Sequence, residues 1–255
     1  MDRHRRYLQQ ASWTRELRSY LFERAGLATS SRVLEVGCGT GAVVSDIRIA
    51  DGPGSIAEHR RGQIALGIDI DFPTLRQCRA NAPRATFGCA DGLVLPLADG
   101  VFDIVFCHFF LLWVPDPLAA LLEMKRVARR NGQILAIAEP DYTLRIDEPA
   151  ELSSAGGLQT QSLRLQGADV SIGSRLAELF SKAGIKIIET GEIGTRPIDP
   201  SIAIDALDEW VVLLADLERI LSTDQLDAIQ QLDADARRRG TRRIHVPTYF
   251  AWGQV

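Results

Sequence analysis

The stretch VLEVGCGTGAV, residues 33–43, constrains the fold of this chain more than any other. Residues able to form a strand lead into three alternating glycines, Gly37, Gly39 and Gly41, and Glu35 lies inside the apolar run. Glycine removes the Cβ that would collide with a ligand, and it permits a tight turn. A strand followed by such a turn and a helix exposes bare backbone at the carboxyl edge of a parallel sheet, where ligands bind. The stretch therefore predicts a ligand site at the end of the first strand.

Strand-like and helix-like segments alternate along most of the chain. Alternation of this kind implies parallel pairing with right-handed crossovers, so the predicted fold class is α/β, Rossmann-like and doubly wound, with a mostly parallel sheet. The expected strands are 32–38, 63–71, 85–91, 102–111, 132–140, 185–193 and 243–255. The expected helices are 3–27, 41–50, 72–82, 116–131, 148–167, 174–184 and two within 200–239, the second capped at Thr223 or Asp224.

Composition excludes several classes of protein. The formal net charge of −4 argues against a nucleic-acid partner, because proteins that bind nucleic acids usually carry an excess of basic residues. The longest apolar run, 104–114, is too short to span a bilayer, and the charged first ten residues lack the apolar segment of a signal peptide. No two of the four cysteines (Cys38, Cys78, Cys89 and Cys107) have C-x-x-C spacing, and no histidine stands at a spacing that suggests a zinc site, so we expect free thiols, no metal site and a cytoplasmic setting.

The glycine spacing alone leaves two ligand classes open. Gly37-x-Gly39-x-x-Ala42 fits the fingerprint of dinucleotide-binding proteins. Asp69 ends the second strand and could accept hydrogen bonds from a ribose diol, as the acidic residue of NAD enzymes does. Asp69 lies 32 positions after Gly37 instead of about 20, which requires an inserted loop over 50–63. The alternative role for Asp69 is a helix N-cap.

The third and fourth strands separate the two classes. Glu35-x-Gly37-x-Gly39-x-Gly41 resembles the first motif of the class I S-adenosylmethionine-dependent methyltransferases, and CADGLVLPLADGVFDIVFC, residues 89–107, resembles their acidic residue, "LP" and "FD". The resemblance covers about residues 30–140, and ubiquinone-type and other small-molecule methyltransferases are the most similar members. It implies a seven-stranded sheet of order 3-2-1-4-5-7-6, with S-adenosylmethionine as cofactor and S-adenosylhomocysteine as product. The cofactor-binding residues that it implies are Glu35, Gly37, Cys38, Gly39, Asp69, Ile70, Asp91, Gly92, His108 and Phe109.

The implied reaction is in-line transfer of a methyl group to an oxygen, nitrogen or carbon nucleophile of a small molecule. His108 is the first candidate for a general base, and a hydrogen-bonded role shaping the cofactor loop is an equal alternative. Tyr142, in EPDY after the fifth strand, is the second candidate at the acceptor site. EPDY is not the N/D-P-P-Y tetrapeptide of base-modifying methyltransferases, which belongs after strand four. Two other functions remain: a nicotinamide oxidoreductase, although no Y-x-x-x-K motif is present, and a non-catalytic S-adenosylmethionine-binding subunit.

Three additions to the core would set substrate choice. The expected organisation is a helical lid over 1–28, a core of 29–196 plus 243–255, and a helical insertion over 197–242 between strands six and seven. The amphipathic segment 205–221 is either part of a lid or the face of a homodimer. The basic run 237–243 is expected to be a solvated helix end, with phosphate or partner binding as the alternative. Phe109, Phe110 and Trp113 are core residues or a substrate wall, and His245 is structural.

Overall fold

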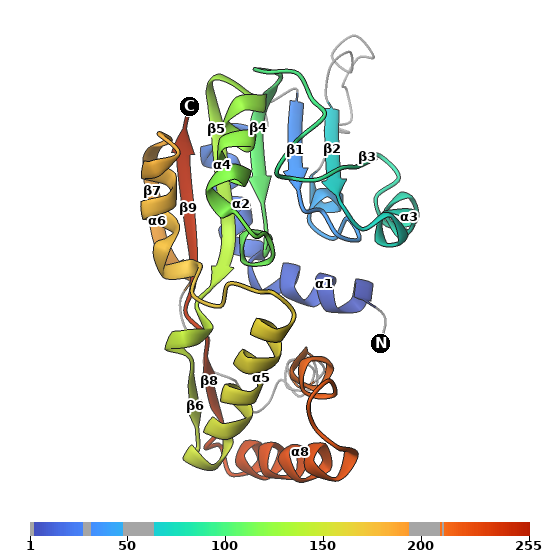
Figure 1. The fold of residues 1–255 in the computed structure, drawn as a ribbon, viewed down its shortest axis with the longest axis vertical. Helices are drawn as coiled ribbons and strands as arrows, with labels where there is room; N and C mark the ends of the chain where they lie inside the picture. Colours follow the sequence, from blue (N-terminus) through green and yellow to red (C-terminus); the bar gives the residue numbers. More distant parts are fainter. Residues whose placement is uncertain (1–2, 28–31, 48–63, 194–209, 211) are drawn as a thin grey trace.

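The computed structural model describes residues 3–27, 32–47, 64–193, 210 and 212–255. A seven-stranded sheet of order β3-β2-β1-β4-β5-β9-β7 forms the upper part of the molecule (Figure 1). Counted along the chain within this sheet, the order is 3-2-1-4-5-7-6, as predicted. The strands are β1 (Arg32–Val36), β2 (Ile64–Asp69), β3 (Thr86–Cys89), β4 (Phe102–Cys107), β5 (Ala128–Pro140), β7 (Lys186–Ile193) and β9 (Thr248–Gln254).

The first five strands are parallel, and β9 pairs antiparallel with both β5 and β7. The carboxyl ends of β1, β2 and β4 therefore meet at one edge of the sheet, the lower edge in Figure 1. Helix α1 (Arg3–Trp13) runs across this edge. The sheet places every predicted ligand-binding segment at one place, because each follows a strand whose carboxyl end lies there.

Both faces of the sheet are covered by helices, which explains the nearly continuous apolar strands. Helices α4 (Pro117–Val127) and α6 (Leu176–Lys182) cover one face, where Val105 is fully buried. Helix α2 (Arg15–Arg24) covers the other, and its Phe22 packs edge-to-face on Phe106 at a centroid distance of 5.1 Å. Alternate residues of β4 thus face opposite cores, as the two-residue period of a strand requires.

The local sequence accounts for the helix starts near the carboxyl edge. Asp116 caps α4, its carboxylate accepting the Ala119 N–H at 2.9 Å, and Pro117 occupies the first turn. Asp71 caps α3 (Phe72–Asn81) through the Thr74 N–H. The helix N-cap considered for Asp69 therefore belongs to Asp71.

Several expectations about the elements were wrong in detail. The helix expected over 116–131 ends at Val127, where β5 begins four residues earlier than expected. The helix of 3–27 is two helices, α1 and α2, separated at Thr14. After the glycine loop the described residues contain only the 3-10 turn Val44–Asp46 instead of a helix, and the loop expected over 50–63 lies outside the described residues. The closing strand is divided into β8 (Arg243–His245) and β9, because Pro247 has no N–H for a ladder. Ser222, with Gln225, makes the capping box of α8 (Thr223–Arg238).

The lower part of the molecule has its own small core. Helix α5 (Ser153–Leu165), helical residues 212–217 and α8 pack around Trp210, Leu213, Leu217 and Leu226. A two-stranded antiparallel sheet of β6 (Ile146–Glu148) and β8, which the sequence did not predict, lies beside them (Figure 1). The apolar side of segment 205–221, as far as it is described, is therefore buried against other helices of the same chain.

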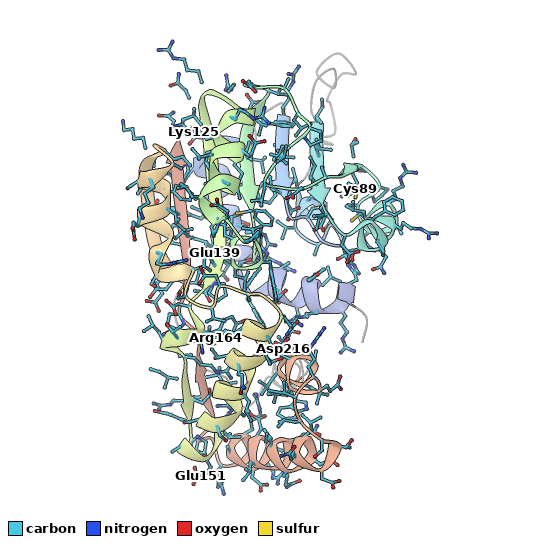
Figure 2. The ribbon with its side chains drawn as sticks, viewed as in Figure 1. Cys89, Lys125, Glu139, Glu151, Arg164 and Asp216 are labelled. Carbon is cyan, nitrogen blue, oxygen red and sulfur yellow. The ribbon has the colours of Figure 1, made fainter. Side chains whose placement is uncertain are left out.

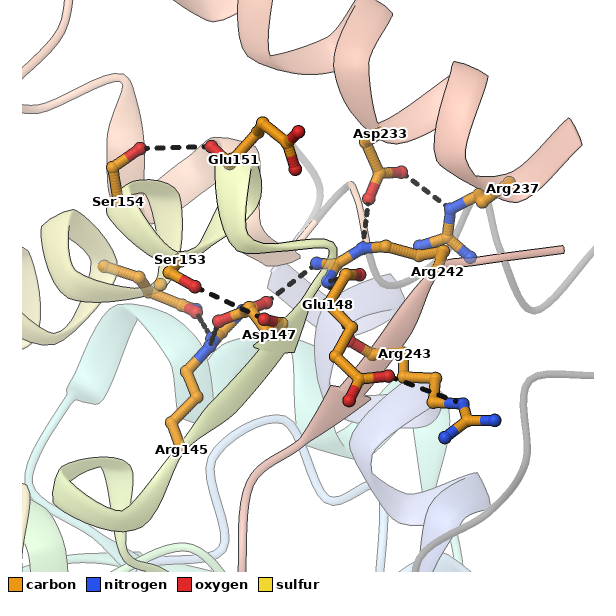
Figure 3. A network of polar contacts seen from close by, with 12 residues as sticks. Arg145, Asp147, Glu148, Glu151, Ser153, Ser154, Asp233, Arg237, Arg242 and Arg243 are labelled. Carbon is orange, nitrogen blue, oxygen red and sulfur yellow. Dashed lines mark hydrogen bonds and ion pairs between the residues drawn. The ribbon is translucent and has the colours of Figure 1, made fainter. Parts of the chain in front are cut away.

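The basic run 237–243 is in part the expected solvated helix end, since Arg238, Arg239 and Arg243 are exposed, but Arg237 and Arg242 differ. Arg242 has a side chain only 1% exposed, and its guanidinium bonds Asp233 at 2.7 Å and Asp147 at 2.9 Å (Figure 3). Arg237 bonds the other oxygen of Asp233 at 2.6 Å. These ion pairs join α8 and the residue before β8 to β6, so Arg237 and Arg242 hold the lower part together from within.

Within the described part of the chain, none of the helices has the length and hydropathy that crossing a membrane requires.

Candidate functional site

The glycine loop after β1 has a backbone that other residues rarely adopt. Gly37, Gly39 and Gly41 have φ of +76°, +52° and +79°. The N–H groups of Gly37 and Cys38 both bond the Ile68 carbonyl, at 2.8 and 3.0 Å, which ties the loop to the end of β2. A residue with a side chain would be strained at any of these three positions, so the turn requires glycine at each of them.

Asp69 fixes the loop from the neighbouring strand. One carboxylate oxygen accepts the Gly39 N–H at 2.7 Å, and the other accepts the Asp71 N–H at 2.9 Å. Each carboxylate oxygen can accept further hydrogen bonds, so the half-buried Asp69 is still able to bind a diol at the edge of the sheet. The sequence predicted the position of Asp69 but not its bond to the glycine loop.

Glu35 is a buried carboxylate with an unsatisfied oxygen. Its side chain is only 2% exposed, and Oε2 has no hydrogen-bond partner within the described residues. Burial raises the pKa of Glu35 well above its usual range, opposed by the Val44 N–H and by the charge of Arg18. A buried polar atom without a partner has a large free-energy penalty, which a bound ligand with a donor group would relieve.

The segments after β2 and β3 lie at the same edge. Asp91 is exposed, and its Oδ1 accepts the Leu93 N–H at 2.9 Å, so within the described residues its Oδ2 can still accept a hydrogen bond from a ligand. Gly92 is buried against Phe110, whose Cζ would lie 2.7 Å from a Cβ at that position. Ile70 is 68% exposed, as expected of an apolar residue that would cover one face of a planar ring.

His108 lies at the end of β4 and is buried. Its Nε2 is 2.8 Å from the Thr14 hydroxyl, and Arg18 donates to the same hydroxyl at 2.5 Å. Burial, with the nearby positive charge of Arg18, lowers the pKa of His108 to about 3. A neutral, hydrogen-bonded imidazole of such low basicity suits the shaping role better than the role of general base.

The residue after His108 makes an unusual turn. Phe109 has φ of +50°, which is uncommon for a residue with a bulky side chain. The chain then brings the Phe110 ring against Gly37, where a Cβ would overlap it, and against Gly92. Phe110 thus bridges two of the predicted cofactor segments, a contact that no local pattern in the sequence predicted.

Helix α1 covers the glycine loop. The Tyr7 ring lies over Gly39, with Cε2 2.8 Å from where a Cβ would be. His4 Nδ1 is 2.8 Å from the Thr40 hydroxyl, and Asn81 of α3 contacts both residues. Tyr7 and His4 therefore lie against the candidate site, and the sequence analysis missed them. Only the amphipathic pattern of 3–27 suggested that this segment would dock.

Tyr142 lies after β5 among charged groups of the lower part. Burial and then Asp216 raise the pKa of Tyr142, while Arg6 and Arg145 oppose this. Asp216 is only 1% exposed and accepts a hydrogen bond from Gln159 at 2.9 Å. Each of its two carboxylate oxygens also lies 3.4 Å from a nitrogen of the Arg6 guanidinium. Figure 2 labels Asp216 in the lower part and Glu139 at the carboxyl end of β5. The structure thus brings Tyr142 together with side chains from α1 and from the insertion.

Fold and site agree with a class I methyltransferase domain, the S-adenosylmethionine-dependent class. The residues present fit that cofactor on three observations: the unpartnered Glu35 oxygen, the side-chain-free turn of Gly37 and Gly39, and the two acidic residues after β2 and β3. Residues 34–136 match the family model described as "Methyltransferase domain", so the chain contains a domain of this family.

Named relatives agree with this class. Methyltransferase GfsG from Streptomyces halstedii is 28% identical over 73% of this chain and 66% of its own length. Demethylmenaquinone methyltransferase from Roseiflexus sp. is 33% identical over 51% of this chain and 52% of its own length. The chain thus spans less than two thirds of either relative.

Solved structures share the fold. Geranyl diphosphate methyltransferase in complex with S-adenosylmethionine superposes with a TM-score of 0.54 over 94% of this chain and 84% of its own. The sequence identity of 11% means that this likeness concerns the fold alone.

Proposed function

We propose that the protein transfers a methyl group from S-adenosylmethionine to an oxygen, nitrogen or carbon nucleophile of a small molecule. The observation that carries the proposal is the buried, unpartnered Glu35 Oε2 beside the glycine loop. A positively charged amino group, such as that of a bound amino acid, would satisfy this oxygen and favour the ionised carboxylate. A dinucleotide pyrophosphate would bring negative charge toward the same carboxylate and is disfavoured.

Each residue has a role in holding the cofactor. The glycine loop and Glu35 would bind the amino-acid part, Asp69 the ribose hydroxyls, and Asp91 with the Gly92 backbone the adenine edge. When bound, S-adenosylmethionine supplies a methyl carbon activated by a sulfonium. Buried apolar neighbours such as Phe110 would exclude water, which favours a reaction in which positive charge at sulfur is lost. Alignment of the acceptor supplies much of the remaining acceleration.

The acceptor side belongs to the additions around the core. We assign residues 1–28 as the lid, 29–196 plus 243–255 as the core and 197–242 as the insertion, and two of the three boundaries fall outside the described residues. Tyr142 would contact the acceptor, because α1, the insertion and the end of β5 converge on it. His108 would act as a neutral group that positions the loop, and its role as a base is the weaker proposal. The demethylmenaquinone relative supports a small organic acceptor over nucleic acid.

Calorimetry with the full chain tests the cofactor first. S-adenosylhomocysteine should bind with measurable heat, whereas NAD⁺ should not, and Glu35→Gln should weaken binding of S-adenosylmethionine. The matched control is Glu178→Gln, which changes a carboxylate paired with Lys182 in α6, beside β7 and away from β1. Heat with NAD⁺ alone would replace the proposal with an oxidoreductase.

A radiolabelled methyl donor and a panel of phenols, quinols, amines and carboxylic acids test the reaction. Transfer to any member establishes the activity and the methylated atom. Tight cofactor binding without transfer would instead favour a non-catalytic subunit. Sedimentation of the same sample tests the homodimer, and a cytoplasmic setting remains a prediction supported by four unpaired cysteines.

A further inference from the structure

Glu139 is a fully buried carboxylate that the proposed reaction does not use. It is the residue before the last of β5, and its side chain has no exposed surface. Its Oε1 accepts the N–H groups of Phe110 and Leu111, both at 3.0 Å. Its Oε2 accepts the N–H of Leu112 at 3.2 Å. One carboxylate thus receives three consecutive backbone N–H groups from the segment that follows β4.

Without Glu139, the backbone N–H groups of this segment would lack hydrogen-bond acceptors. The 3-10 turn Leu111–Trp113 begins there, and the first N–H groups of any helix lack partners within the helix. Phe109, just before it, has a left-handed φ of +50°, and such a backbone persists only when its surroundings determine it. The Phe109 N–H itself bonds the Ala138 carbonyl at 3.0 Å. The end of β5 therefore determines the course of residues 109–112 through four hydrogen bonds.

The course of this segment decides where the Phe110 ring lies. The ring contacts Gly37 of the glycine loop and Gly92 beside the predicted adenine site. Both glycines lack side chains, so the ring packs directly on the backbone of those two segments. A shift of the backbone at 110–112 would move the ring toward or away from the place where a cofactor would lie.

We propose that Glu139 is a positioning residue for cofactor binding, its carboxylate holding residues 110–112 so that the Phe110 ring stands between Gly37 and Gly92. Glu139 itself does not touch the cofactor. The inference rests on the proposed function for its ligand, but the hold on 110–112 is a property of the chain alone. The two parts can therefore be measured separately.

Hydrogen exchange without cofactor tests the hold. In Glu139→Gln at pH 8, the peptides that contain Phe110, Leu111 and Leu112 should exchange roughly tenfold or more faster than in the unchanged protein, because one of the acceptor oxygens is replaced by an NH₂ donor. Peptides of α6 should exchange as before. Unchanged exchange at 110–112 in a folded Glu139→Gln protein would overturn the proposal.

Calorimetry with S-adenosylhomocysteine tests the consequence. Glu139→Gln and Phe110→Ala should each raise Kd roughly tenfold or more, and the double variant should raise it by clearly less than the product of the two, since one residue acts through the other. The control is Asp103→Asn. The Asp103 carboxylate also accepts a backbone N–H, that of Arg32 at 2.9 Å, but it lies at the opposite edge of the sheet. Its Kd should not change.

Three results decide the matter. Multiplicative effects of Glu139→Gln and Phe110→Ala would make Glu139 merely structural and overturn the proposal. Should Glu139→Gln fail to fold, Glu139→Asp takes its place, because it keeps the charge but shortens the side chain by one methylene. It must give the same faster exchange at 110–112 and the same non-multiplicative rise in Kd, with smaller changes in both. If the unchanged protein binds no S-adenosylhomocysteine, the proposed function fails, and the exchange result still decides whether Glu139 holds the segment.

Discussion

Replacing Arg242 by Met should destabilise the protein far more than the same change at the adjacent Arg243. The Arg242 guanidinium bonds two carboxylates, those of Asp147 and Asp233, and two backbone carbonyls, with a side chain only 1% exposed. Methionine fills a similar volume but takes this partner from two buried carboxylates, each of which keeps one other arginine, Arg145 or Arg237. Removing one member of a buried ion pair reduces the free energy of unfolding by about 3–5 kcal/mol.

The neighbouring residue is a matched control. Arg243 has a side chain 81% exposed, and it meets the exposed Glu148 at 3.5 Å. Exposed pairs of this kind contribute about 0–1 kcal/mol, because water and salt screen them. Both variants remove one positive charge, so a difference between them reports burial and not net charge.

Urea unfolding followed by circular dichroism and tryptophan fluorescence measures the difference. With an m-value of about 2 kcal/mol/M, Arg242→Met should lower the midpoint by roughly 1.5–2.5 M, and Arg243→Met by less than about 0.5 M. Arg242→Met should also separate an early transition of the lower part from that of the sheet, since the lost bonds join α8 and the residue before β8 to β6. Equal midpoints for the two variants, or a loss below about 1 kcal/mol for Arg242→Met, would refute this reasoning.

Three further predictions concern the site. Burial raises the pKa of Glu139 to about 7 from an ordinary 4.5, so the stability that its protonation adds is complete below about pH 4.5 and is lost as the pH rises through 7. The free energy of unfolding should therefore fall over this interval relative to Glu139→Gln, and parallel curves for the two proteins would contradict it. Asp69→Asn should weaken S-adenosylhomocysteine binding more than Asp91→Asn in calorimetry, since only Asp69 also holds the Gly39 N–H, and the reverse order would contradict the assigned roles. Gly37→Ala should reduce the free energy of unfolding by about 1–3 kcal/mol in urea, because φ is +76° and a Cβ would overlap Phe110; a change below about 0.5 kcal/mol would show that the turn relaxes freely.

The sequence predicted the sheet well because its signals are local. The alternation of apolar strands with helices, and the resemblance of residues 30–140, led to the strand order that the structure has. The turn at Gly37 and Gly39 could be predicted for the same reason, since each glycine has a positive φ that its neighbours require.

The contacts that complete the site could not be predicted in the same way. Glu139 bonds residues 27 to 29 positions before it, and Tyr7 covers a glycine 32 positions after it. Nothing in the local pattern of EPDY distinguishes a capping carboxylate from a surface one. Arg242 was misjudged because a run of arginines is usually solvated, and only its packing between Asp147 and Asp233 reveals otherwise.

The position of β9 between β5 and β7 has a consequence for synthesis on the ribosome. Strand β7 emerges well before β9, and among the described strands β9 is its only partner in the sheet. Until residues 248–254 emerge, β5 has an open edge and β7 has nowhere to pair, while α8 and β8 are already made. Such a nascent chain exposes strand edges that invite association with other chains, so chaperones would be needed most during this interval.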